Sequence, residues 1–301
     1  MRIVPAACAA LLGLLATGTS VWAQTGDSKS AGFKFLTIGS GARAVGLGET
    51  MVADMEDPFV LEYNPAGLAG IGRAVVSFAH TEYFQDTRGE HVAASVPIGP
   101  WAAGARVGYF GTEDLPYRTG PSEQPIAFFD ATDGVFQAAV ARRMNETFSL
   151  GMSAGYVIEH IDQETAQSAV FALGGQYRRS DRLTVGASLV NFGPSASFVE
   201  KDFKMPNRFQ LGGLYHFNHF TIRGELVAPD NQNAKWHLGT EATPSPYFAL
   251  RAGIRLGYDS QVFSAGIGAK TPNGQFGVDY AFVPYSNDFG STHRVGVSVR
   301  P

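Results

Sequence analysis

From Arg73 to the end of the chain, uncharged and charge-bearing positions alternate with a period of two residues. Successive side chains of a β-strand point to opposite faces of a sheet, so this alternation predicts strands with one uncharged and one charged face. In a soluble β-sandwich the charged face would meet water, whereas in a membrane barrel it points into the lumen. The pattern is clear in residues 249–256, where Leu250, Ala252, Ile254 and Leu256 alternate with Ala249, Arg251, Gly253 and Arg255.

Fourteen such segments are predicted. Most are about 8–12 residues long, near the roughly 9–11 residues that a tilted strand needs to cross a bilayer. The predicted fold class is all-β: a transmembrane antiparallel barrel of about fourteen strands over residues 73–301. The expected strands are 73–80, 91–98, 101–110, 134–142, 148–159, 166–177, 183–191, 205–216, 220–227, 234–243, 249–256, 261–270, 274–284 and 292–300.

The expected connections alternate in length. An even number of strands with both termini in the periplasm places tight turns on the periplasmic side and long loops outside. One connection, 257–260, is short where a long one is expected. The short connections are 99–100, 143–147, 178–182, 217–219, 244–248 and 271–273, and the long ones are 81–90, 111–133, 192–204, 228–233 and 285–291.

Composition agrees with a sheet that faces lipid. Charged residues make up 17% of the chain, below the roughly one quarter typical of soluble domains, and 36 of the 301 residues are glycine. Aromatic residues lie near many expected strand ends, as in Trp101, Tyr109 and Trp236, which is typical of the girdles at membrane interfaces. The net charge of −4 gives no basic field, which argues against nucleic acid as a partner.

The N-terminus is typical of a secretory signal peptide over residues 1–23. Arg2 supplies the positive charge, residues 6–16 are apolar, and small residues at Val21 and Ala23 suit a cleavage site. The alternative is an uncleaved anchor helix, for which the apolar stretch is short. Cleavage would leave a mature chain from residue 24 without cysteine. The expected location is the outer membrane of a diderm bacterium, with membrane lipid as a partner.

Residues 24–72 do not alternate, and we expect them to form a hatch inside the lumen. The run 38–48 is rich in glycine and alanine, but no Gly-Lys-Ser/Thr follows, so a phosphate-binding loop is disfavoured. Close packing of backbone inside the lumen explains the small residues better. Asp54, Glu56 and Asp57 resemble a metal cluster, yet no further ligand spacing supports one, and caps of short helices or turns are preferred.

Asn64-Pro65 is a turn-starting dipeptide, because proline fixes its own φ and biases the preceding residue away from the helical region. We expect it at the junction between the hatch and the first strand, with a binding role as the alternative.

The segment from Gly39 to Ile71, GSGARAVGLGETMVADMEDPFVLEYNPAGLAGI, resembles the N-terminal motif of the PorV/PorQ family. The segments 205–215 and 278–299 are also similar to that family. A looser form of the Asn-Pro-Ala step occurs in FadL-like channels, and this distant similarity implies fourteen strands with an internal hatch. The hatch residues that carry the resemblance are Gly41, Ala42, Arg43, Gly46, Gly48, Asp57, Asn64, Pro65, Ala66, Gly67 and Leu68.

The charged faces of the expected strands predict a polar network in the lumen. Charges facing lipid would cost roughly 2–4 kcal/mol each near the midplane, so they are expected to point inward. A structural network that fills the lumen and pins the hatch is favoured over a polar constriction for a solute. The candidates are Arg106, Arg223, Glu225, Lys235, His237, Glu241, Arg251, Arg255 and Asp279.

The sequence suggests no enzyme. The seven histidines are scattered without the spacing of a zinc motif, and no nucleophile elbow or Ser-His-Asp arrangement is evident. No catalytic, cofactor-binding or metal-binding residue is therefore predicted, and no cofactor.

Two functions compete. The PorV/PorQ resemblance implies an accessory or shuttle component linked to type IX-like protein secretion, with a translocon or cargo protein as partner. The alternative is a FadL-like passive transporter of hydrophobic small molecules; a purely structural envelope protein is a third possibility. For partner binding, the long loops 111–133 and 192–204 supply aromatic candidates, namely Tyr117, Phe128, Phe129, Phe198 and Phe203.

Overall fold

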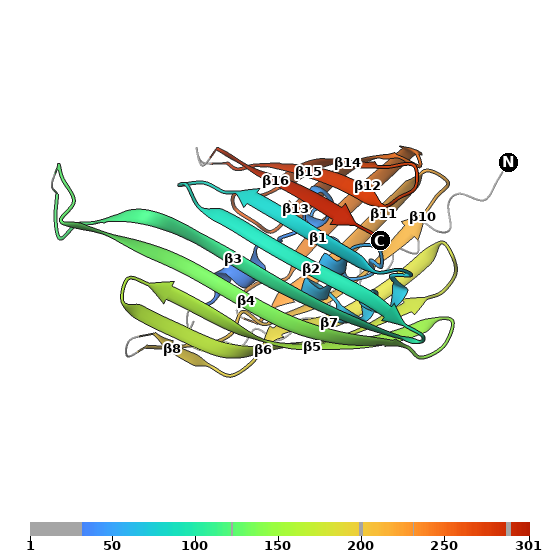
Figure 1. Ribbon diagram of the computed structural model, residues 1–301, viewed down its shortest axis with the longest axis horizontal. Helices are drawn as coiled ribbons and strands as arrows, with labels where there is room; N and C mark the ends of the chain where they lie inside the picture. Colours follow the sequence, from blue (N-terminus) through green and yellow to red (C-terminus); the bar gives the residue numbers. More distant parts are fainter. Residues whose placement is uncertain (1–31, 122, 199–200, 231, 287–289) are drawn as a thin grey trace.

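Fourteen antiparallel strands close into a barrel in the computed structural model (Figure 1). The structure describes residues 32–121, 123–198, 201–230, 232–286 and 290–301, so the expected signal peptide lies outside the described residues. Each barrel strand pairs with its neighbours in chain order, and β1 closes the barrel on β16. The predicted fold class and strand number are confirmed.

The barrel is interrupted in sequence by two short strands that form their own sheet, β8 (Ala196–Phe198) and β9 (Lys201–Phe203). The barrel strands are β1 (Val75–Glu82), β2 (Arg88–Ile98), β3 (Trp101–Tyr117), β4 (Ala127–Arg143), β5 (Phe148–Ile161), β6 (Glu164–Arg178), β7 (Leu183–Phe192), β10 (Arg208–His216), β11 (Phe220–Pro229), β12 (Lys235–Ser245), β13 (Phe248–Leu256), β14 (Phe263–Lys270), β15 (Phe276–Pro284) and β16 (Ser291–Val299).

The two ends of the barrel differ in their connections. We call the end with the β2–β3 and β4–β5 turns the short-turn end, and the end with the β7–β10 connection the long-loop end. The expected alternation is imperfect, because the β5–β6 turn at the long-loop end is only residues 162–163. The expected loop 111–133 is largely strand: β3 and β4 continue past the wall as a paired hairpin (Figure 1, green). Glu113 and Asp130, which fall within the expected loop, lie within β3 and β4.

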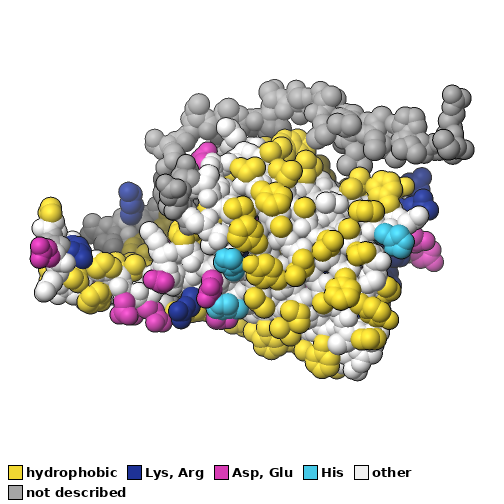
Figure 2. All heavy atoms as spheres, turned by 90° about the horizontal axis from the view of Figure 1, so that it is seen from above, with side chains coloured by type: hydrophobic (Ala, Val, Ile, Leu, Met, Phe, Trp, Pro, Cys, Tyr) yellow, Lys and Arg dark blue, Asp and Glu magenta, His cyan; other side chains and the backbone are white. Residues whose placement is uncertain are grey.

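The two faces of the wall have opposite character. On β13, Leu250 and Ile254 are exposed on the outside, while Arg251 and Arg255 are buried inside. Figure 2 shows hydrophobic side chains across much of one side of the wall and charged side chains toward its two ends. This arrangement suits lipid outside and polar contacts inside, as the period-two pattern predicts.

A chain of short helices fills the lumen. They are η1 (Lys34–Thr37), α2 (Ala42–Gly46), η2 (Pro58–Glu62) and η3 (Pro65–Gly70), and residues 39–54 between and around them are buried. No helix among the described residues is long and apolar enough to cross a membrane. We call the described residues 32–72 the hatch.

Local sequence explains where two of these helices begin. The carboxylate of Asp57 accepts a hydrogen bond from the backbone nitrogen of Phe59 at 2.9 Å, and the Asn64 side-chain oxygen accepts one from Ala66 at 3.1 Å. Each cap precedes a proline at the first helical position, where the missing N–H costs nothing. Asn64-Pro65 thus starts η3, one short helix before the first strand.

Candidate functional site

Glycines let the hatch backbone touch the wall backbone. A Cβ placed on Gly253 of β13 would lie 2.1 Å from the nitrogen of Gly48, and one on Gly46 would lie 3.2 Å from the Cα of Gly266 on β14. Gly48 also has a φ of +65°, which disfavours any side chain. The glycine-rich hatch residues therefore serve close packing in the lumen.

Other motif residues lie in the same packing. A Cβ on Gly67 would meet the Asp54 carbonyl at 2.5 Å, and Gly41 precedes α2 and lies against Phe59. Pro65 and Ala66 are buried in η3, and a Cβ on Gly151 of β5 would lie 2.4 Å from the Ala66 nitrogen.

One ion-pair network joins the hatch to four wall strands. From the hatch, Arg43 contacts Asp54 at 2.9 Å and Glu241 of β12 at 3.3 Å. From the wall, Arg223 of β11 lies 2.5 Å from the same Asp54 carboxylate. Glu241 also binds Arg251 at 2.6 Å, and Arg251 extends the network to Asp279 of β15 at 2.6 Å. Four of the sequence candidates thus meet, together with the motif residue Arg43.

The remaining candidates lie in separate groups. Arg106 of β3 pairs with Glu62 of η2 at 2.9 Å, and Arg255 of β13 pairs with Glu49 at 2.6 Å. Glu225 accepts hydrogen bonds from the Val52 nitrogen at 3.0 Å and from Gln210 at 2.7 Å.

At the edge of the lumen, His237 Nε2 lies 2.9 Å from the Tyr258 hydroxyl oxygen. The Lys235 ammonium sits 4.0 Å from the centre of the same ring. The lumen therefore holds several separate polar groups, and each contacts a different part of the hatch or, for His237 and Lys235, Tyr258.

The hatch carboxylates titrate differently because their surroundings differ. Burial alone would raise the pKa of Asp54, but Arg43 and Arg223 outweigh it and hold that pKa below its usual value. Burial raises the pKa of Asp57 to about 6, since no cation contacts it directly and its main compensation is the Phe59 backbone hydrogen bond. Asp54 is thus an ionic anchor, and Asp57 is a helix cap that keeps its proton to a higher pH than an exposed aspartate does.

Several important residues were missed by sequence reasoning. Glu49, Glu62, Arg208 and Arg294 are buried in the lumen, and none was among the candidates. For the two arginines a signal existed, because both fall on inward positions of the period-two pattern, on β10 and β16. The predicted polar network included inward charges from β11 to β15 and from β3, and it left out β10 and β16.

Free space in the described part of the lumen is limited. A polar recess between the hatch and the wall at β1, β15 and β16 is lined by Arg43, Asp57, Asp279 and Ser298. Another is lined by Gln176 and Arg178, also at the short-turn end. Among the described residues, no group of three His, Cys, Asp or Glu side chains is placed to hold a metal ion.

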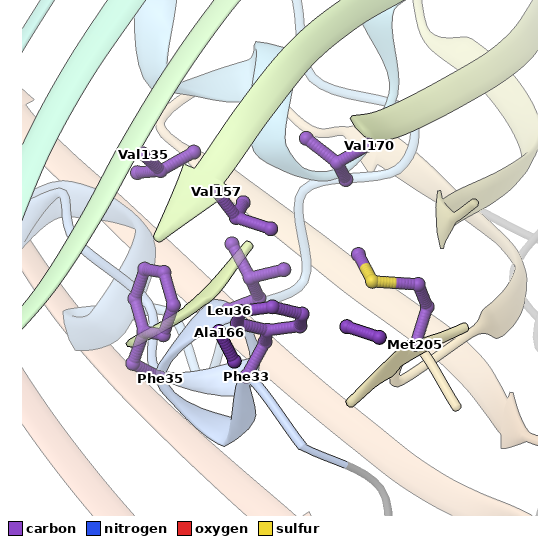
Figure 3. Packing of buried hydrophobic residues seen from close by; sticks show 9 residues of the cluster. Phe33, Phe35, Leu36, Val135, Val157, Ala166, Val170 and Met205 are labelled. Carbon is purple, nitrogen blue, oxygen red and sulfur yellow. The ribbon is translucent and has the colours of Figure 1, made fainter. Parts of the chain in front are cut away.

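An apolar compartment lies inside the long-loop end (Figure 3). Phe33, Phe35 and Leu36 of the hatch fill it. Polar anchors hold this segment: the Phe33 nitrogen donates to Glu159 at 2.9 Å, and the Asn191 side chain donates to the Leu36 carbonyl at 3.2 Å. The walls of the compartment are Val135, Val157, Ala166, Val170, Ala196 and Met205.

The aromatic loop candidates separate into two groups. Phe198 and Phe203 pack against the apolar compartment, and the Phe203 ring centre lies 5.2 Å from that of Phe33. They are therefore not free contact residues, because the β8–β9 sheet folds back over the lumen. Tyr117 and Phe128 lie on the projecting hairpin and are 47% and 62% exposed, and Phe129 is half-buried beside them.

Comparison with known proteins gives a fold and a partial family match. Residues 13–123 match the model of the Uncharacterised protein family (UPF0164). A comparison with curated protein sequences found no match.

Solved structures share the barrel fold across most of the chain. The Ralstonia pickettii toluene transporter TbuX superposes with a TM-score of 0.66 at 12% identity, covering 87% of this chain and 98% of that one. The Pseudomonas putida toluene transporter TodX superposes with a TM-score of 0.63 at 14% identity, covering 86% of this chain and 97% of that one. A Pseudomonas aeruginosa FadL homologue superposes with a TM-score of 0.61 at 11% identity, covering 87% of this chain and 98% of that one.

Proposed function

We propose that this chain is an outer-membrane barrel that binds hydrophobic small molecules at its long-loop end and passes them inward. The observation that carries the proposal is the apolar compartment at the long-loop end, which Phe33, Phe35 and Leu36 fill. Withdrawal of this hatch segment would leave a concave apolar pocket lined by aliphatic side chains, the kind of surface that binds such molecules.

The barrel wall supports the membrane location. Phe78, Leu250, Ile254 and Val297 are exposed on its outside, where lipid would cover them. β1 begins and β16 ends at the short-turn end, which we assign to the periplasm. The described hatch starts at the opposite end, where the Gly32 nitrogen donates to the Lys204 carbonyl at 3.2 Å, so a periplasmic mature N-terminus stays a prediction.

The named function of two solved neighbours agrees with the proposal. TbuX and TodX are toluene transporters with the same fold, although their identity to this chain is low. Compact aromatic hydrocarbons are therefore the first ligands to test.

Uptake in cells tests the proposal. The chain is expressed in a diderm host that lacks its own hydrophobic-compound channel, and uptake of radiolabelled toluene is compared with an empty vector. We expect faster uptake with the protein, and faster uptake still for Phe33→Ala with Leu36→Ala, because the compartment is then less well filled. Equal uptake with and without the protein, at confirmed outer-membrane levels, would contradict the proposal.

A second candidate function is docking of a protein partner, such as a component of a type IX-like secretion system. The projecting hairpin favours it, because Tyr117, Ile126 and Phe128 are exposed there, 47%, 65% and 62% respectively. A variant with residues 115–129 replaced by a tight turn separates the two functions. It should keep toluene uptake, but it should lose any partner recovered by cross-linking from native membranes.

A further inference from the structure

Arg208 is a buried cation without a partner. It occupies an inward position on β10, is 8% exposed, and its side chain makes no hydrogen bond or ion pair with the described residues. Its one specific contact is with Tyr63 of the hatch, whose ring centre lies 5.7 Å from the Arg208 Cζ. A guanidinium taken out of water without an anion is costly, so this position calls for a compensating group.

The hydroxyl of Tyr63 is a second unpartnered donor next to it. This residue is 1% exposed and its hydroxyl has no hydrogen-bond partner among the described residues. The hydroxyl lies against Gly39, where an added Cβ would be 2.5 Å away, and Glu49 is next to the same point. The Gly39 carbonyl in turn accepts a hydrogen bond from Arg294 Nε at 3.1 Å. Tyr63 therefore contacts Arg208 through its ring and lies beside Gly39, the residue that Arg294 binds.

Positive charge exceeds negative charge in this part of the lumen. Arg294 is 2% exposed. Among the described residues its side chain donates to the Gly39 carbonyl and to the Thr292 hydroxyl, the latter at 3.0 Å, and it faces the Tyr83 ring. Glu49 is already paired with Arg255 at 2.6 Å.

Glu225, the other nearby carboxylate, accepts from Gln210 and the Val52 nitrogen, and His237 faces Glu49 from β12. Burial alone would raise the pKa of Glu49, but Arg255, His237, Arg208 and Arg294 together hold it below its usual value. Arg208 and Arg294 thus lie among carboxylates that other donors already occupy: Arg255 on Glu49, Gln210 on Glu225 and Arg106 on Glu62.

We propose that Arg208, the Tyr63 hydroxyl and Arg294 form a binding site for a small anion of the carboxylate class inside the lumen. Carboxylate oxygens match guanidinium and phenol donors in charge and geometry. The site is separate from the apolar compartment and from the network of Arg43 and Asp54, and it does not depend on the transport proposal. Its occupant would neutralise the buried charge and fix the hatch against β10 and β16.

Thermal unfolding of the full-length barrel in detergent tests this site. The protein is refolded at pH 7 with increasing sodium acetate, so that the anion need not enter a closed lumen. Controls contain sodium salts of a bulky sulfonate at equal ionic strength, or neutral acetamide. We expect a rise in unfolding temperature with acetate alone, because a ligand that binds only the folded state stabilises it.

Variants locate the effect. Arg208→Gln should remove the acetate response and should not lower the unfolding temperature in its absence, whereas removal of a paired arginine would lower it. Tyr63→Phe keeps the ring and should weaken apparent acetate binding by about tenfold, as the loss of a charge-assisted hydrogen bond predicts. Arg142→Gln, on the exposed β4 end, should respond like the parent.

Two results would overturn the proposal. One is no acetate-specific rise in the parent protein, which would mean that water alone satisfies these groups. The other is an equal rise in Arg208→Gln, or in Tyr63→Phe if the first variant does not fold. Neither result depends on toluene uptake, so this site and the transport function fail separately.

Discussion

The guanidinium of Arg223 on β11 lies 2.5 Å from the carboxylate of Asp54 in the hatch, although 169 residues separate them in the chain. Both side chains are almost fully buried, and Arg43 shares the same carboxylate. The contact therefore links the hatch to the wall through charge that water does not screen.

Removing one partner of this pair should be strongly destabilising. Asp54→Asn leaves two buried guanidinium groups without their main anion, and we expect a loss of about 3–5 kcal/mol in the free energy of unfolding. Urea unfolding of the detergent-folded barrel measures it. Glu56→Gln is the matched control, since Glu56 is 52% exposed and pairs with the same Arg43, and it should cost at most about 1 kcal/mol. Similar losses in both variants would contradict this account.

Packing of hatch glycines against wall glycines gives a second prediction. Gly253→Ala places a methyl group against the backbone of Gly48, which cannot move like the end of a side chain. We expect a loss of roughly 1–3 kcal/mol, with faster proteolysis of the hatch at a given protease concentration. Gly224→Ala is the control, because its added methyl group would meet only a Leu238 methyl at 3.7 Å. Equal protease resistance of the two variants would argue against close packing at Gly253.

The pH dependence of stability should carry a contribution from Asp57. Burial raises its pKa in the folded protein to about 6, above the ordinary value near 3.8. The folded state therefore binds the proton more tightly, so this contribution is fully present below the ordinary pKa and is lost as pH rises to about 6. Asp57→Asn keeps an oxygen acceptor for the Phe59 nitrogen but cannot ionise.

Unfolding midpoints of the two proteins at several pH values test this. The free energy of unfolding of Asp57→Asn, relative to that of the parent, should rise by roughly 2–3 kcal/mol between pH 4 and pH 6 and then stay constant. Asp57→Ala loses the helix cap and should cost about 1 kcal/mol relative to Asp57→Asn at every pH. A constant difference between parent and Asp57→Asn across this range would show that Asp57 does not titrate as described.

The projecting hairpin should be dispensable for folding. Beyond Gly111 and Asp130, the described strand ladder of β3 and β4 lies within the hairpin, because the pairing with β2 and β5 ends there. Replacing residues 115–129 with a tight turn should leave the free energy of unfolding within about 0.5 kcal/mol of that of the parent. The heat-dependent gel mobility of the folded barrel provides a second readout. A large loss of stability would mean that the hairpin supports the wall.

Sequence patterning predicted the strands and the inward charges because both follow from the two-residue period. Arg251 and Arg255 face the lumen for that reason alone. The pattern contains no information on partners across the lumen, so it placed Arg106 with the charges of β11 to β15 rather than with Glu62. Hatch carboxylates such as Glu49 lie in an irregular segment whose path only the folded chain defines.

Loop aromatics were harder to place from sequence. Phe203 and Phe128 both fall in segments expected to be long loops, yet one packs against Phe33 and the other is exposed. The difference arises because the β8–β9 sheet folds over the lumen while the β3–β4 hairpin extends away from it. The orientation of each of these two segments depends on contacts between residues far apart in the sequence.

The ionic contacts between hatch and wall also act on strand alignment during assembly. A slip of one residue along β13 would turn Arg251 and Arg255 toward lipid. It would leave Glu49 without its cation and Glu241 without the arginine closest to it. The β16 strand that seals the cylinder carries Arg294 under the same constraint. The lumen thus disfavours misaligned closure, because the correct register is the one in which each of these arginines meets its partners inside the barrel.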